Sequence, residues 1–236
     1  MTEQYYGIKP KLITTFDLSY LNDMHFFLYM PIIMPKHPLN PNELYSENFL
    51  DAIKQRLPGS LRPMASMIAT AIATETVDYD KPYPYWYVTS KKLHVTPDNM
   101  ANRPGWHSDG YGTSDVNYIW TDKKPTEFAI QEFNNLSRSH SISLDQFQEQ
   151  IDNSNIVRYN ENDLLRIDER HIHRTPVDTY EGMRHFVKIS GSHHKFNLIG
   201  NAHNHELDYD WKMYSREELR NMESVEDNSD FVLEVG

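Results

Sequence analysis

From residue 79 onward, the chain is a series of short apolar runs separated by turn residues, and this pattern constrains the fold more than any other feature. Tyr83, Tyr85 and Tyr87 occupy alternate positions, as residues on one face of a strand do. Further strand-like runs occupy 116–120, 127–133, 156–159, 163–167 and 184–190. Many short strands in succession are typical of β-sandwiches and jelly rolls. We therefore expect a mainly β fold.

Helices are expected to brace this β core. Apolar residues recur at helical spacing over 46–57 and again over 61–76, and Pro58-Gly59 separates the two segments. The Pro-rich residues before them are expected to form an extended arm with one strand over 26–33. Two pairs spaced as capping boxes, Ser143 with Gln146 and Ser215 with Glu218, predict helices over 143–151 and 216–222.

We expect one domain, with an arm and helices over 1–78, the β core over 79–200 and a C-terminal extension over 201–236. The chain has no Cys, which excludes disulfide scaffolds, zinc–thiolate centres, iron–sulfur clusters and cysteine nucleophiles. The net charge of −11 argues against binding to duplex nucleic acid. No signal-peptide pattern opens the chain, and the longest apolar stretch, 26–34, is too short to span a bilayer. A cytoplasmic protein without a membrane partner is therefore expected.

The sequence also contains a His-x-Asp pair, His107 and Asp109. On a strand, these two side chains point to the same face and can share one metal ion. Two His and one carboxylate form the facial triad of non-haem Fe(II) oxygenases, which leaves positions open on the metal. With 12 His and 18 Asp in 236 residues, chance alone predicts about one such pair. Other residues of the chain must therefore distinguish a metal site from a chance occurrence.

Such residues lie about sixty positions downstream. An apolar strand over 163–167 leads into a turn that carries His171 and His173, and either imidazole is a candidate for the third ligand. Arg184 follows His173 by eleven residues and opens the next strand. Its planar guanidinium suits a carboxylate, because it can donate two parallel hydrogen bonds.

This order of residues resembles the Fe(II)/2-oxoglutarate-dependent dioxygenases, particularly their phytanoyl-CoA hydroxylase and taurine dioxygenase branches, over about residues 106–190. The family signature is H-x-D, a long gap, a second His and an Arg about ten or eleven residues later. The resemblance implies a double-stranded β-helix, a cupin-like jelly roll with bracing helices. It further implies that His107, Asp109 and His173 bind Fe(II) and that Arg184 binds the distal carboxylate of 2-oxoglutarate. His173 is preferred to His171 because of its spacing from Arg184.

Two further residues are candidates for co-substrate binding. The segment around Thr126 is similar to a Thr-containing strand that contacts 2-oxoglutarate in taurine dioxygenase-like enzymes, although an ordinary strand residue fits the same pattern. Lys188 lies four residues after Arg184, on the same strand face. Lys188 is expected to meet either an anionic group of a substrate or co-substrate, or one of the 34 acidic residues.

The resemblance implies an enzyme that uses Fe(II), 2-oxoglutarate and O₂ to hydroxylate a C–H bond of a small molecule, amino acid or peptide. Halogenation is disfavoured, because Asp109 fills the position that halogenases leave to a small residue. Two alternatives remain: a non-catalytic jelly-roll binding module, and a cupin-like metal enzyme that does not use 2-oxoglutarate.

Overall fold

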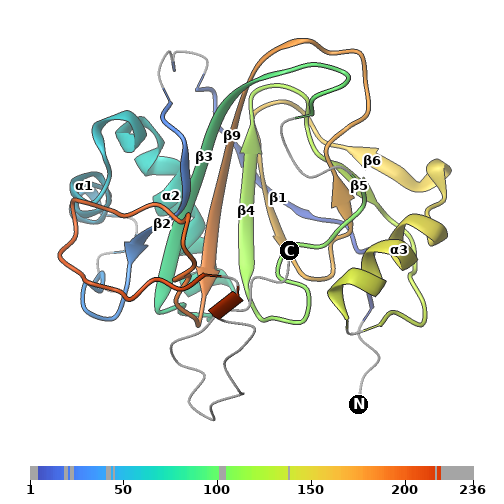
Figure 1. The fold of residues 1–236 in the computed structure, drawn as a ribbon. Helices are drawn as coiled ribbons and strands as arrows, with labels where there is room; N and C mark the ends of the chain where they lie inside the picture. The colour runs from blue at the N-terminus through green and yellow to red at the C-terminus, as the bar shows by residue number, and fades with distance from the viewer. Residues whose placement is uncertain are drawn as a thin grey trace. The chain divides into compact units, whose positions relative to one another are not determined.

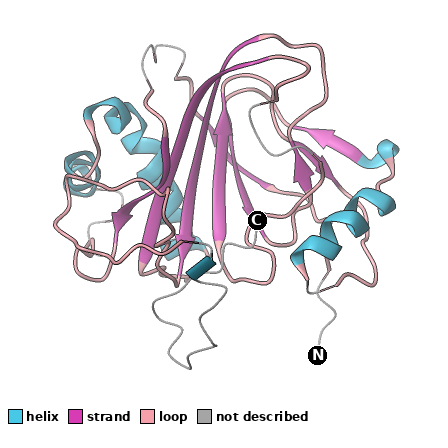
Figure 2. Cartoon of the chain, viewed as in Figure 1, coloured by secondary structure: helices cyan, strands magenta, loops and turns pink. Residues whose placement is uncertain are grey.

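The computed structural model describes residues 5–18, 21, 24–40, 44, 46–100, 105–137, 139–215 and 217–218. Antiparallel strands are its main element, and its helices are few and short (Figures 1 and 2). The described residues fall into two compact units. Unit 1 draws on Met1–Tyr20 and Lys92–Val187, and unit 2 draws on Leu21–Lys91 and Lys188–Glu234. Each unit therefore combines segments that are distant in sequence.

The larger sheet of unit 1 contains β1 (Lys11–Thr15), β7 (Asp163–Asp168) and β4 (Val116–Thr121) as antiparallel neighbours. Strand β9 (Gly182–Ser192) follows β4 in the strand order, and its residues up to Val187 belong to unit 1. Leu165 of β7 pairs with Leu12 of β1 on one side and with Ile119 of β4 on the other. The expectation of only one strand in the N-terminal arm is therefore wrong. Strand β1 was missed because its alternation is short and most of its residues are exposed.

A smaller antiparallel sheet of unit 1 has the order β6 (Ile156–Arg158), β5 (Glu127–Ala129) and β8 (His173–Arg174). Phe128 of β5 is fully buried in one apolar cluster with Ile119, Leu165 and Ile167 of the larger sheet. The two sheets of unit 1 thus pack face to face through this cluster, in the manner of a β-sandwich. We refer to it as the inter-sheet cluster.

Helix α3 (His140–Gln150) belongs to unit 1 and begins earlier than the expected residue 143. Ser139 is its N-cap residue, whereas Ser143 lies inside the helix with no exposed surface. Gln146 accepts a hydrogen bond from the backbone N–H of Ser137, at 2.7 Å, rather than from that of Ser143. The interpretation of Ser143 and Gln146 as a capping box is therefore wrong, because the polar first turn of this helix gave no periodic signal. The short 3-10 turn η4 (Asn153–Asn155) follows.

Unit 2 pairs β2 (Phe27–Ile33) with β3 (Tyr85–Val95) in antiparallel fashion, and α1 (Glu47–Gln55) lies close to the expected 46–57. Ser46 caps α1, since its hydroxyl accepts the N–H of Phe49 at 3.1 Å. The second expected helix is divided into a 3-10 turn η2 (Gly59–Met64), α2 (Ala65–Ala73) and a π turn η3 (Thr74–Asp78). Pro63 in η2 lacks the N–H that a continuous α-helix would use.

Two remaining expectations concern the termini of unit 2 and membrane insertion. Ser215 and Glu218 form the expected capping box: Glu218 N–H donates to Ser215 Oγ at 3.1 Å, and Ser215 N–H donates to the Glu218 carboxylate at 2.6 Å. Residue 216 and residues 219–222 of that expected helix lie outside the described residues. Within the described ranges, every helix is too short or too polar to cross a bilayer.

Candidate metal centre

His107 and His173 are direct cross-strand neighbours in unit 1. The N–H of His107 donates to the carbonyl of His173 at 3.0 Å, and the N–H of His173 donates back to the carbonyl of His107 at 2.9 Å. Two residues that exchange both hydrogen bonds project their side chains to the same face of an antiparallel pair. Their imidazole ring centroids accordingly lie 4.5 Å apart.

Asp109 joins the two imidazoles from the turn that follows His107. Its Oδ2 lies 3.9 Å from Nε2 of His173, and ligand atoms of all three residues lie within 4.8 Å of one another. The turn depends on Gly110, whose φ is +71° and where a Cβ would lie 2.9 Å from the hydroxyl of Thr113. That hydroxyl also donates to the Gly110 carbonyl at 2.8 Å, which closes the turn. A side chain at position 110 would therefore strain the backbone that holds Asp109.

The hydrogen bonds of the two imidazoles leave one particular ring nitrogen for a metal. Nδ1 of His107 lies 3.0 Å from the carbonyl of Gly105, and Nδ1 of His173 lies 2.9 Å from the carbonyl of His171. A carbonyl oxygen only accepts, so Nδ1 must donate its proton in both rings. The lone pair of the neutral ring is then on Nε2. Metal-binding His side chains commonly have this arrangement, in which the second nitrogen is fixed by a carbonyl.

His171, the alternative third ligand, faces a different group. Its Nδ1 lies 2.9 Å from Oδ1 of Asp168, and the residue is not part of the triad. Burial alone would raise the pKa of Asp168, but hydrogen bonds from His171 and Arg170 outweigh burial and hold that pKa well below its usual range. The structure thus brings His173, and not His171, together with His107 and Asp109.

Arg184 lies on β9 and is only 3% exposed. Its Nε donates to the carbonyl of Lys123 at 3.1 Å, whereas its buried Nη2 has no hydrogen-bond partner among the described residues. Burial lowers the pKa of Arg184 to about 10, against the opposing effect of Asp122 and Asp178. A buried guanidinium with an unused donor is energetically costly unless an acceptor reaches it.

The two acids near Arg184 are already engaged by other groups. Asp122 lies 2.5 Å from Nδ1 of His185, and Asp178 lies 3.3 Å from both Nζ of Lys124 and Nη1 of Arg158. Neither carboxylate is therefore dedicated to Arg184. Sequence reasoning missed the buried Lys124, since a charged side chain next to a turn gives no periodic signal for burial.

His173 and Arg184 both border the inter-sheet cluster. The ring of His173 lies 5.8 Å from that of Phe128, and the guanidinium carbon of Arg184 lies 5.2 Å from the ring of Phe186, which packs against the same cluster. The two predicted site residues therefore line a common apolar interior in unit 1. Low polarity there strengthens any charge interaction that Arg184 makes.

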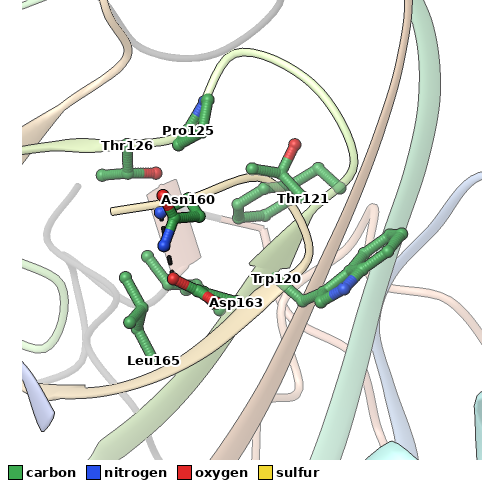
Figure 3. Close-up of a pocket in the computed structure, with 9 residues that line it drawn as sticks. Trp120, Thr121, Pro125, Thr126, Asn160, Asp163 and Leu165 are labelled. Carbon is green, nitrogen blue, oxygen red and sulfur yellow. Dashed lines mark hydrogen bonds between the residues drawn. The ribbon is translucent and has the colours of Figure 1, made fainter. Parts of the chain in front are cut away.

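Thr126 is buried and lines a small pocket of unit 1, together with Phe186 and Leu165 (Figure 3). The pocket encloses a volume of only about 10 Å³, roughly the room for one water molecule. Asp163 also lines it and accepts the N–H of Asn160 at 2.9 Å, so part of its wall is acidic. Arg184 is not among the residues that line this pocket.

Lys188, the last predicted co-substrate residue, belongs to unit 2. Its Nζ donates to the hydroxyl of Tyr29 at 2.8 Å and lies 4.7 Å from the centre of that ring. This contact tests neither of the two alternatives for Lys188, an anionic ligand or an acidic residue. Its predicted contact with a co-substrate stays a prediction.

Comparisons with known proteins add little to this geometry. No family model matches the chain, and no curated protein matches it. Among solved structures, the chain is similar to a bsmA homolog from Methylobium petroleophilum, with 14% sequence identity over 70% of this chain and a TM-score of 0.25. The chain spans 63% of the length of that protein, which is less than two thirds. At this TM-score, the likeness supports no conclusion about fold or function.

Proposed function

We propose that the chain is a non-haem Fe(II)- and 2-oxoglutarate-dependent oxygenase with a jelly-roll fold. The observation that carries this proposal is the convergence of His107, Asp109 and His173 within 4.8 Å. Two imidazoles and one carboxylate are the donor set that non-haem Fe(II) oxygenases use. The antiparallel sheets that pack face to face in unit 1 are compatible with a jelly roll.

The three residues fit an iron ion on chemical grounds. The lone pairs that would bind the metal lie on Nε2 of His107 and Nε2 of His173, because both Nδ1 atoms face carbonyls. Asp109 supplies an anionic oxygen beside them. Fe(II) held by these three ligands would supply the activation of O₂, while the protein contributes orientation and a dry interior.

Arg184 supports 2-oxoglutarate as the co-substrate. Its buried Nη2 lacks a partner, and both neighbouring acids are engaged elsewhere, so a ligand carboxylate would complete its hydrogen bonding. In this proposal, the distal carboxylate of 2-oxoglutarate binds Arg184, and the apolar inter-sheet cluster excludes water around that ion pair. Thr126 is a further candidate contact for the co-substrate, from the pocket wall.

The overall reaction converts a C–H bond, O₂ and 2-oxoglutarate into a C–OH group, succinate and CO₂. The substrate is proposed to be a small molecule, an amino acid or a peptide, in keeping with the net charge of −11.

The test measures succinate formed from 2-oxoglutarate by the full chain with Fe(II) and O₂. We expect slow turnover without a substrate and faster turnover with a substrate from a panel of small molecules. Asp109→Ala should lower the rate at least 100-fold while the circular dichroism spectrum is retained. Asp145→Ala, which removes an exposed carboxylate from α3, is the matched control and should keep the wild-type rate. Equal rates in wild type and Asp109→Ala would contradict the proposal.

A further inference from the structure

Unit 2 contains a second pocket, which has no part in the metal centre. Its enclosed volume is about 120 Å³. The segment after β9 returns toward β2 (Figure 1). Pro31 of β2 and Phe196 of that segment both contribute to the pocket wall. Every residue that lines this pocket belongs to unit 2.

The walls of this pocket are aromatic. Trp211 lies 5.0 Å from Tyr209 with the two ring planes inclined by 61°, and His203 stacks on Tyr209 at 4.4 Å. Phe196 lies behind them and stacks on the buried Tyr87 at 4.2 Å. His203 is not part of a candidate metal-binding group, since among the described residues that group consists of His107, Asp109 and His173. The ring of His203 instead extends an aromatic wall.

Hydrogen bonds hold these walls in place. The side-chain amide of Asn204 donates to the carbonyls of Pro31 at 2.7 Å and Arg56 at 2.9 Å, and its backbone N–H donates to the hydroxyl of Tyr209 at 2.8 Å. The N–H of Ala202 donates to the carbonyl of Leu28 in β2 at 2.7 Å. Asn204 is fully buried, so the loop is anchored to the sheet rather than loosely placed. The pocket is thus preformed.

The charge at this pocket is negative and uncompensated. Asp210 lines the pocket, and its carboxylate has no ion-pair or hydrogen-bond partner among the described residues. Asp208, two residues earlier, is instead paired with Lys36 at 3.3 Å. The cation closest in sequence, Lys212, lies over the ring of Tyr214 at 4.6 Å. Among the residues that the structure describes, no Lys or Arg lines the pocket.

We propose that this pocket binds an organic cation, specifically a methylated ammonium group. Aromatic faces carry negative potential and attract a cation within about 6 Å of a ring centre, and Trp attracts it best. Trp211 and Tyr209, which line the pocket, supply the aromatic surface for this attraction, and Asp210 supplies the counter-charge. Methyl groups on the ammonium fill the apolar space, since they cost less to desolvate than N–H groups. A neutral sugar or a planar ring could also pack against the aromatic walls, but neither would interact with the charge of Asp210. The charge of Asp210 therefore favours a cation over these ligands.

The test titrates choline into the full-length protein and follows the indole N–H resonances of the four Trp residues by NMR. We expect saturable, millimolar binding that shifts the Trp211 resonance, which is assigned by its loss in Trp211→Phe. The neutral isostere 3,3-dimethylbutan-1-ol should bind at least about 5-fold more weakly, because it has the same shape without the charge. The titration needs no iron and no 2-oxoglutarate, so its outcome is independent of the proposed oxygenase function.

Two acidic variants separate a specific site from general attraction to a negative protein. Asp210→Asn should weaken choline binding about 3- to 10-fold. Asp208→Asn removes an equal charge from the same loop but outside the pocket, and should change the affinity less than 2-fold, by our estimate for a screened surface charge. Equal binding of choline and its neutral isostere, an equal effect of the two variants, or no shift of the Trp211 resonance would each overturn the proposal.

Discussion

Replacing Arg184 with Met tests whether this buried cation is kept for a ligand or for the fold. Met has a similar length and no charge. Burial lowers the pKa of Arg184 from its ordinary value to about 10, and this difference corresponds to roughly 3 kcal/mol against the charged form in the folded protein. The residue is 3% exposed, so solvent screening reduces this figure little. Both folded and unfolded chains carry the charge at neutral pH, so the full cost is present there. The cost of burying the charge would fall only as the pH rises above about 10 toward the ordinary pKa of Arg, and the stability of the protein should increase over that range.

The substitution also removes favourable contacts. The hydrogen bond from Nε to the Lys123 carbonyl is worth about 1.5–3 kcal/mol, because its donor is charged. The opposing contributions nearly cancel, so Arg184→Met should leave the ligand-free protein between unchanged and about 2 kcal/mol more stable. If the fold required the Arg184 charge, Arg184→Met would instead destabilise the ligand-free protein by about 3–5 kcal/mol, which is the usual cost of breaking a buried ion pair.

The assay is thermal unfolding of Fe(II)-loaded protein without O₂, with and without 2-oxoglutarate. At 100 times its dissociation constant, 2-oxoglutarate should stabilise the wild type by about 2.7 kcal/mol, which raises Tm by roughly 5–10 °C for a chain of this size. Arg184→Met should show almost none of this rise, and Arg184→Lys should show part of it, since charge remains but the two-pronged geometry is lost. Destabilisation of the ligand-free Met variant by 3 kcal/mol or more, or an undiminished response to 2-oxoglutarate, would refute the reasoning.

Two further predictions concern the segment between β7 and β8. His173→Ala should weaken Fe(II) binding at least 100-fold in a competition titration with a chelator, whereas His171→Ala should weaken it less than 10-fold; the reverse order would make His171 the ligand. The low pKa of Asp168 means that its charge stabilises the fold above the ordinary pKa of 3.8 and that this contribution is lost as the pH falls below it. Asp168→Asn should therefore cost about 1.5–3 kcal/mol at neutral pH and much less in acid, as measured by urea unfolding. A cost that does not change with pH would contradict this explanation.

The elements that could be predicted from sequence are those with a local signal. Helix α1 follows from apolar spacing and the Ser46 cap, and β7 follows from its apolar run. Strand β1 could not be predicted, because its stability comes from pairing with β7, which is about 150 residues away. The start of α3 was misplaced because its first turn is polar and Ser143, taken for a cap, is buried inside the helix.

The candidate site divides in the same way. The His-x-Asp spacing and the later His173 could be found in the sequence, because a same-face pair is a local property. The exchange of hydrogen bonds between His107 and His173 could not be found, since it depends on long-range strand pairing. The unused donor on Arg184 likewise depends on which acids the fold engages elsewhere.

The most direct test of the proposed metal centre is a titration of 2-oxoglutarate into Fe(II)-loaded protein without O₂, followed by the charge-transfer absorbance of the chelate. The account predicts a saturable visible band in the wild type that is absent in His173→Ala and requires a higher 2-oxoglutarate concentration in Arg184→Lys. If no band forms at saturating Fe(II) and 2-oxoglutarate, or if it forms equally well without His173, the triad His107, Asp109 and His173 is not the centre of a 2-oxoglutarate oxygenase.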